Sequence, residues 1–231
     1  MNYLYGLKKG LPIGLGYLSV SFGFGITAFR QGISAVGAIL ISLLNLTSAG
    51  QVAGLTIMVA GGTVLEMITA QLIINLRYSL MGISLTQKLS GNFSTGHRMI
   101  AAFGITDENF AVASSEKKSV TPAYYYGLMT LPVIGWTLGT ALGAICGEIF
   151  PSDVSAALGL AIYAMFVAIV IPELRKSKGV LFGVGISVAL SCILYYVPIL
   201  KVIPGGFAII ICAVVASAAA AYFMPRREEN E

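Results

Sequence analysis

The run "QGISAVGAILISLLNLTSAGQVAGLTIMVAGGTVL", residues 31–65, holds 35 consecutive residues without a charge. A helix that crosses about 30 Å of hydrocarbon needs only about 20 residues, so this run is too long for one straight span. The polar sequence "LLNLTSAGQVAGL" (43–55) lies in its middle, where polar side chains are poorly matched to lipid. We therefore expect a broken or unwound helix near 33–60 that turns at "GGT" (61–63).

The composition of the whole chain also indicates that membrane lipid surrounds most of it. Of its 231 residues, 57% are hydrophobic and only 10% are charged, whereas soluble domains carry about 25% charged residues. Too few polar residues remain to cover a water-facing surface, so we expect an all-α integral membrane protein, in contact with membrane lipid. The net charge of +4 comes from short basic clusters between apolar runs, so it does not indicate nucleic-acid binding.

Uncharged runs predict about seven transmembrane helices, the second broken or re-entrant, in a single polytopic membrane domain covering residues 1–231. The expected spans are 10–29, 33–60, 64–86, 121–147, 154–171, 179–199 and 204–224, with a polar loop over 87–118. Seven crossings, the count we favour, place ten Lys and Arg residues on one side and three on the other. The positive-inside rule then puts the C-terminus in the cytoplasm. With a re-entrant second segment, the N-terminus, with Lys8 and Lys9, would face the cytoplasm too.

Two patterns concern the packing of the helices. In "GWTLGTALGAICG" (135–147) a glycine recurs every four residues, which predicts a smooth helix face that a neighbour can approach closely. The neighbour is either a helix of the same chain or a partner. A faint similarity between "LPIGLG" (11–16) and "LPVIGWTLG" (131–139), which we expect to open two helices, suggests a degenerate internal repeat.

The charge that most needs an explanation is Arg77, in "TAQLIINLRYSLMGISL" (69–85). Eleven helical residues, a rise of about 16 Å, separate it from Lys88, so it would lie near the bilayer midplane. Its neighbours one turn away are all apolar, so its partner must be another segment, a water-filled cavity or a substrate anion. Arg77 is therefore either half of a structural ion pair or a carboxylate-binding or gating residue, and we favour the second.

The break in the second segment is another candidate site. An unwound turn frees backbone N–H and C=O groups, which together with Ser48, Gly50 and Gln51 would hold a zwitterion at mid-membrane depth. The alternative is a kink that Ser and Thr hydroxyls satisfy internally.

The sequence "GITDENFA" (104–111) supplies acidic groups. Thr106 is expected to cap a helix whose acidic first turn complements the helix dipole. Alternatively, Asp107 or Glu108 is the counter-charge to Arg77 or a proton carrier.

Other chemistry is not indicated. Cys146, Cys192 and Cys212 lie far apart in apolar runs, and the only histidine is His97, so we expect buried free cysteines and no metal site. Nucleophile-elbow and Walker motifs are absent from the sequence, so we expect no enzymatic activity and no cofactor. Glu66 is interpreted as a helix-start carboxylate near the interface, or else as part of one polar pathway with Arg77.

In order along the chain, the Ser-Ala-Gly-Gln break (48–51), "INLRYSLMG" (74–82) and "AFGITDENFA" (102–111) resemble the AzlC-type permease family, the large subunits of branched-chain amino acid exporters. The similarity spans about residues 7–120. It implies a proton-coupled secondary transporter in the bacterial cell membrane that exports branched-chain and other apolar amino acids. It also implies a partner, a small AzlD-type membrane subunit, for which the glycine face at 135–147 is one docking candidate.

We therefore predict substrate contacts from the break and from the motif around the arginine, with coupling or counter-charge roles for the two acidic residues. The predicted residues are Ser48, Gly50, Gln51, Asn75 and Arg77 for the substrate and Asp107 and Glu108 for coupling. Two alternatives stay open, a non-transporting structural or assembly subunit and a passive channel.

Overall fold

The computed structural model describes residues 1–149 and 177–224, together with positions 151, 153, 167, 170, 171, 174 and 175. These residues form α-helices and one 3-10 helix, and within these ranges the chain contains no β-sheet. The predicted span at 154–171 lies almost entirely outside the described residues, so it stays a prediction.

The helices follow one another along the chain with short connections. They are α1 (Tyr3–Arg30), α2 (Ala35–Leu44), α3 (Ala49–Val59), α4 (Val64–Thr86), α5 (Thr95–Phe103), α6 (Asp107–Ser115), α7 (Pro122–Ile149), α9 (Lys178–Tyr196), the 3-10 helix η1 (Pro198–Val202) and α10 (Gly205–Phe223). The chain divides into two compact units. Unit 1 consists of Met1–Gln51 and Asn75–Ile162, and unit 2 of Val52–Ile74 and Tyr163–Glu231.

Four helices of the described chain, α1, α7, α9 and α10, are long and apolar enough to cross a membrane. Helix α4 has 23 residues, which is long enough, but Glu66 and Arg77 make it less apolar. Helices α2 and α3 are apolar but short. The chain is thus an all-α membrane protein, as its composition predicted.

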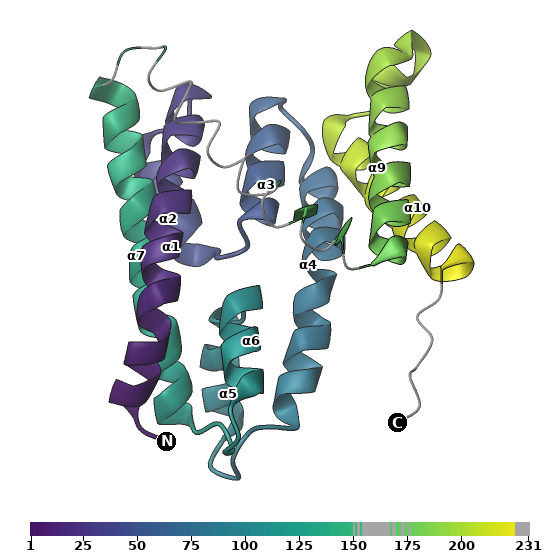
Figure 1. The fold of residues 1–231 in the computed structure, drawn as a ribbon. Coiled ribbons are helices and arrows are strands. Elements are labelled where there is room, and N and C mark those ends of the chain that lie inside the picture. The colour runs from purple at the N-terminus through teal and green to yellow at the C-terminus, as the bar shows by residue number, and fades with distance from the viewer. Residues whose placement is uncertain are drawn as a thin grey trace. The chain divides into compact units, whose positions relative to one another are not determined.

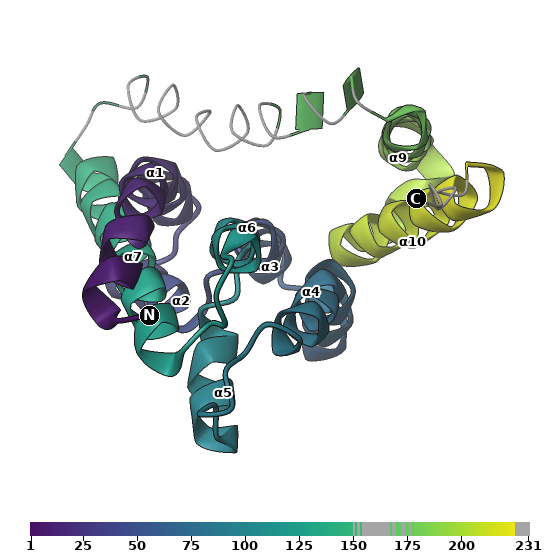
Figure 2. The ribbon, with the colours of Figure 1, turned by 60° about the horizontal axis from the view of Figure 1, so that its bottom comes forward.

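Unit 1 is built on α1 and α7, which lie side by side and run in the same direction (Figures 1 and 2). Glycines on both helices bring the two backbones together. A methyl group added at Gly10, Gly135 or Gly143 would collide with a backbone carbonyl of the facing helix. The first helix begins at Tyr3, earlier than the predicted residue 10, because the side chain of Asn2 caps it by accepting from the backbone N–H of Tyr5 at 3.0 Å.

This packing decides between the two neighbours expected for the glycine face at 135–147. Helix α1 covers that face, so it is an internal contact and not the docking surface for a partner that we considered. The two similar segments do not open helices either. Pro12 and Pro132 both lie inside their helices, α1 and α7, about ten residues from the start.

The break predicted in the second segment is confirmed. Helix α2 ends at Leu44 and α3 begins at Ala49. The side chain of Asn45, the C-cap of α2, accepts a hydrogen bond from the backbone N–H of Thr47 at 3.0 Å. Ser48 has a φ of +35°, which side chains other than glycine rarely adopt.

The polar loop expected at 87–118 is folded, and the helix expected after Thr106 is α6. It contains the short helices α5 and α6, whose apolar residues pack with α7 around the fully buried Tyr124, Tyr125 and Leu128. The Nζ of Lys88 donates to the backbone carbonyls of Ser114 and Glu116 at the end of α6, at 2.5 and 3.0 Å.

Unit 2 contains the antiparallel helices α9 and α10, joined by η1 (Figure 1). The rings of Phe182 and Phe223 pack edge to face, with centroids 6.0 Å apart, where the two helices meet. The three cysteines are free, but only Cys212 is buried; Cys146 is partly exposed and Cys192 is exposed, so the expectation of burial is wrong for Cys192.

Candidate functional site

Arg77 on α4 and Asp107 at the start of α6 form an ion pair in unit 1. Nη1 and Oδ2 are 2.8 Å apart, and the side chains are 46% and 51% exposed. The Nη2 of Arg77 donates to the hydroxyl of Tyr78 at 3.2 Å. Exposed charges are costly in hydrocarbon, so the open side of this pair is expected to face a water-filled space.

The first turn of α6 holds both acidic candidates. The Thr106 hydroxyl caps the helix, accepting from the backbone N–H of Asn109 at 3.4 Å, as the sequence predicted. Partial burial raises the pKa of the half-exposed Asp107 above its usual value, the Arg77 guanidinium opposes this shift, and the Glu108 carboxylate adds to it. Asp107 therefore binds a proton more readily than a fully solvated aspartate does.

Glu108 contacts an aromatic pair between α1 and α7. The Tyr17 hydroxyl donates a hydrogen bond to Oε2 of Glu108. The Tyr17 ring packs edge-on against Trp136, with ring centroids 5.3 Å apart. A carboxylate beside aromatic rings suits a cation such as an ammonium group, since both attract positive charge.

A buried hydrogen-bonded network connects Trp136 to the broken segment. The Nε1 of Trp136 donates to Oε1 of Gln51 at 2.8 Å, and Nε2 of Gln51 donates to the Ser42 hydroxyl at 2.9 Å. The Ser42 and Thr140 hydroxyls share a hydrogen bond of 2.7 Å. Each of these side chains is at most 2% exposed, so the amide of Gln51 is held in one orientation.

These contacts form one series of polar groups across unit 1. From one end to the other it contains Thr140, Ser42, Gln51, Trp136, Tyr17 and Glu108. The Arg77–Asp107 pair lies at its acidic end, because Asp107 precedes Glu108 in the chain. We call the series and this ion pair together the polar track.

The remaining predicted residues are neighbours in sequence of Gln51 or Arg77. Ser48 lies in the turn that leads into α3, and Gly50 is in the first turn of α3 next to Gln51; the backbone N–H of Gly50 donates to the Thr47 carbonyl at 3.1 Å. The hydroxyl of Thr47 is buried and has no hydrogen-bond partner in the described part of the chain, so hydroxyls do not satisfy this break completely. Asn75 is partly buried on α4, two residues before Arg77.

Sequence reasoning missed four members of the track, Tyr17, Ser42, Trp136 and Thr140. Trp136 is the only tryptophan in the chain, and Ser42 interrupts an apolar helix, so both residues could have been singled out from the sequence. Tyr17 and Thr140 could not be singled out, because a tyrosine or threonine is common in a membrane helix and the glycine pattern around Thr140 predicts only close packing.

Glu66 belongs to unit 2 and has a different environment from the one predicted. It is the third residue of α4, but its side chain is only 3% exposed rather than open to the interface. Its Oε1 accepts from the backbone N–H of Gly206 at 2.7 Å. It thereby caps α10, whose own N-cap residue, Pro204, makes no side-chain hydrogen bond to the helix.

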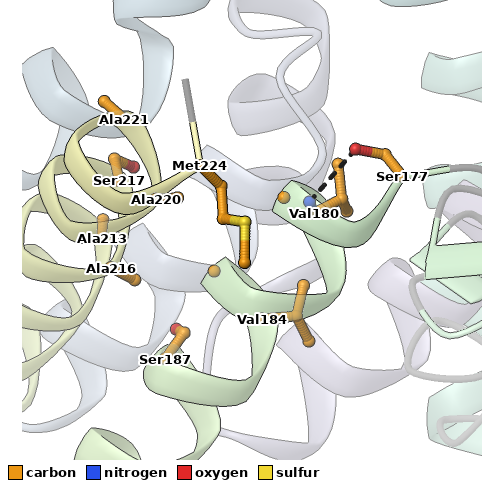
Figure 3. Close-up of a pocket in the computed structure, with 12 residues that line it drawn as sticks. Ser177, Val180, Val184, Ser187, Ala213, Ala216, Ser217, Ala220, Ala221 and Met224 are labelled. Carbon is orange, nitrogen blue, oxygen red and sulfur yellow. Dashed lines mark hydrogen bonds between the residues drawn. The ribbon is translucent and has the colours of Figure 1, made fainter. Parts of the chain in front are cut away.

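Unit 2 also contains a cavity of about 500 Å³ between α9 and α10 (Figure 3). Small side chains line it, among them Ser187, Ala216 and Ser217, and Met224 extends across one end (Figure 3). None of the described residues that line it carries a charge. A zwitterion would leave both its charges unpaired there, so the polar track is the better candidate site.

The described residues offer no metal site, since no three His, Cys, Asp or Glu side chains among them come together. The candidate site is instead an ion pair, a second carboxylate and a buried amide inside an all-α membrane protein. Such a combination is typical of membrane proteins that move polar solutes.

Comparison with known proteins agrees with this class. The family model described as "AzlC protein" matches residues 12–150, and the chain belongs to this family. The chain is 35% identical over 172 residues to an uncharacterized membrane protein of Archaeoglobus fulgidus, covering 74% of this chain and 75% of that protein.

Two named relatives are more distant. The inner membrane protein YgaZ of Escherichia coli is 25% identical over 207 residues, covering 86% of this chain and 84% of YgaZ. The branched-chain amino acid transport protein AzlC of Bacillus subtilis is 27% identical over 192 residues, covering 80% and 74%. No solved structure matches the chain. The family and these relatives support a role in membrane transport.

Proposed function

We propose that this chain is a secondary active transporter that exports branched-chain and other apolar amino acids in exchange for protons. The observation that carries the proposal is the polar track, which joins a broken helix to an arginine and two carboxylates. The name of the Bacillus subtilis relative, a branched-chain amino acid transport protein, supports the substrate class.

A zwitterion fits the two charges of the ion pair. Its carboxylate can take the place of Asp107 on Arg77, and its ammonium can then bind the Asp107 carboxylate that was released. The zwitterion adds one charge of each sign, so the net charge of the site is unchanged and every charge has a partner. The N-terminus of α3, with Ser48 and Gly50, is a second place for the substrate carboxylate, since helix N-termini bind anions.

The acidic residues would provide the coupling. Asp107 cannot hold a proton and an ammonium at once, and such competition at one carboxylate is what exchange of an amino acid for a proton requires. Burial raises the pKa of Asp107, which makes the protonated state accessible. Glu108, held by Tyr17 beside Trp136, would stabilise the ammonium from the other side.

The arrangement in the cell belongs to the same proposal. The chain would be the large subunit of a two-component exporter in the cell membrane, with its C-terminus in the cytoplasm and a small AzlD-type membrane subunit as its partner. Because α1 covers the glycine face of α7, that subunit would dock elsewhere.

The closed Arg77–Asp107 pair also fits the second candidate function, a structural or assembly subunit whose partner transports the substrate. In that case the pair holds α4 to α6 and never opens.

The experiment that separates them is counterflow of radiolabelled leucine in proteoliposomes, with this chain alone and with the small subunit. Leucine uptake that depends on this chain and responds to an imposed proton gradient supports the proposal. Transport by the partner without this chain would refute it, and flux that ignores the proton gradient would indicate a passive channel.

A further inference from the structure

Unit 1 also contains a cavity, which lies between the last turns of α4 and helix α5 and includes no residue of the polar track. Its volume is about 320 Å³, within the range of roughly 300–1,000 Å³ that small-molecule sites occupy. Its wall is mostly apolar and includes Ile83, Leu89 and Ile105. Tyr125 also lines the cavity, but its hydroxyl already donates a hydrogen bond to the backbone carbonyl of Gly104 at 3.2 Å. The interior therefore suits a hydrocarbon chain rather than a polar solute.

One cation, Arg98, lines this cavity. Its Nε donates to the backbone carbonyl of Phe93 at 3.4 Å, and within the described ranges no carboxylate lies at ion-pair distance from it. The three carboxylates of the same loop, Asp107, Glu108 and Glu116, contact other side chains. The Nη atoms of Arg98 are thus available to an anion from outside the chain.

The surroundings of the cavity show which kind of anion can reach it. Met99 and Ile100 on α5 are 73% and 54% exposed, and Leu80 on α4 is 67% exposed. Exposed apolar side chains on a short helix that also carries a basic residue are typical of a helix lying in the membrane interface. We therefore expect lipid to reach the cavity, with its headgroups at the level of Arg98.

We propose that this cavity binds one anionic phospholipid, with an acyl chain against the apolar wall and the phosphate on the guanidinium of Arg98. Arginine binds phosphate through two parallel N–H bonds, which gives the site its preference for the headgroup. A soluble anion would use Arg98 but leave the apolar wall unfilled. The proposal rests on the fold of unit 1 and not on the substrate of the transporter.

The test uses the purified full-length chain in detergent and native mass spectrometry. Phosphatidylglycerol and phosphatidylcholine with identical acyl chains are added in turn, so only the headgroup differs. We expect stronger retention of phosphatidylglycerol, and a loss of about fivefold in Arg98→Gln, since one basic residue contributes about that much to anionic lipid binding. Ala102→Phe, a change at an exposed position that lines the cavity, should weaken retention of both lipids.

Lys117→Gln is the matched control, because it removes a positive charge from the same loop without touching the cavity. Equal retention of phosphatidylglycerol by Arg98→Gln and Lys117→Gln would overturn the proposal, and so would retention that Ala102→Phe leaves unchanged. Glycerol phosphate, which lacks acyl chains, should not compete with the lipid, and full competition would refute the role of the cavity. If Arg98→Gln does not fold, the comparison of Ala102→Phe with wild type still shows whether lipid occupies the cavity.

Discussion

The sharpest prediction concerns Arg77→Gln, because the two candidate functions assign different magnitudes to it. In both, the variant removes the ion pair with Asp107. The side chains of the pair are 46% and 51% exposed, and ion pairs open to water contribute only about 0.2–1 kcal/mol to the free energy of unfolding. The variant should therefore remain folded in the membrane.

The effect on transport should be much larger. If Arg77 holds the substrate carboxylate, its loss removes a charged hydrogen bond of about 1.5–3 kcal/mol, which lowers leucine affinity by about 10- to 150-fold. The charge swap Arg77→Asp with Asp107→Arg restores the pair but leaves the site without its cation in the original place. We expect the swap to recover stability and not transport.

Two measurements on each variant check this, thermal unfolding in detergent and leucine counterflow in proteoliposomes. Lys118→Gln, which removes a positive charge elsewhere in unit 1, is the matched control and should behave as wild type in both. Transport by Arg77→Gln at the wild-type rate would refute the site. Recovery of both stability and transport in the swap would establish the structural alternative, and a loss of about 3–5 kcal/mol in the single variant would show that the pair is shielded from water.

Three further predictions follow from the packing and the acidic groups. Gly139→Leu on α7 would collide with the backbone of α1 and should abolish the monodisperse peak in size-exclusion chromatography. Gly16→Leu on α1, where the added side chain meets open space, should preserve that peak. Equal elution profiles of the two variants would contradict the packing of α1 against α7. Glu66→Ala should lower the free energy of unfolding by about 1–2 kcal/mol because α10 loses its cap, and Glu66→Gln should lower it less. Denaturant unfolding measures both losses, and the reverse order of the two variants would exclude the cap. Leucine affinity should fall as the pH decreases through the raised pKa of Asp107, by up to about tenfold per pH unit, because one proton competes with the ammonium. In isothermal titration this dependence should vanish in Asp107→Asn, and an unchanged pH profile would remove Asp107 from the coupling step.

Features with a local cause could be predicted from the sequence. Lipid requires long uncharged runs, so α7, α9 and α10 occupy nearly the same residues as the predicted spans. The break between α2 and α3 was visible because polar residues cluster where hydrocarbon cannot satisfy them. The cap at Thr106 was visible because it depends on three neighbouring residues.

Features that depend on which helices meet could not be predicted. Glu66 and Gly206 are 140 positions apart, and neither segment contains a sequence pattern that predicts contact with the other. The link from Gln51 through Trp136 to Tyr17 depends on the parallel packing of α1 and α7, which hydropathy does not report. Of the two short helices in the polar loop, α6 was predicted from its cap but α5 was not, since a helix this short depends on packing against its neighbours more than on its own sequence.

The shared direction of α1 and α7 has a consequence for topology. If both cross the membrane, the chain must cross an odd number of times between them, since it has to return before it can cross again in the same direction. A full crossing by α4 and a re-entrant α2–α3 segment meet this condition of parity. With the predicted span at 154–171 the chain then crosses six times, which leaves eleven Lys and Arg residues on the cytoplasmic side and two outside. Lys8 and Lys9 would then obey the positive-inside rule.

In this topology the segments that carry Gln51 and Glu108 enter the membrane from opposite sides. The broken segment that carries Gln51 descends from the outer face, and the loop that carries Glu108 rises from the cytoplasmic face. Trp136 and Tyr17, which join them, would form the partition that separates an outer half-channel from an inner one. One ring contact between Trp136 and Tyr17, with one hydrogen bond on each side of it, holds this partition, so it can open without unfolding either helix.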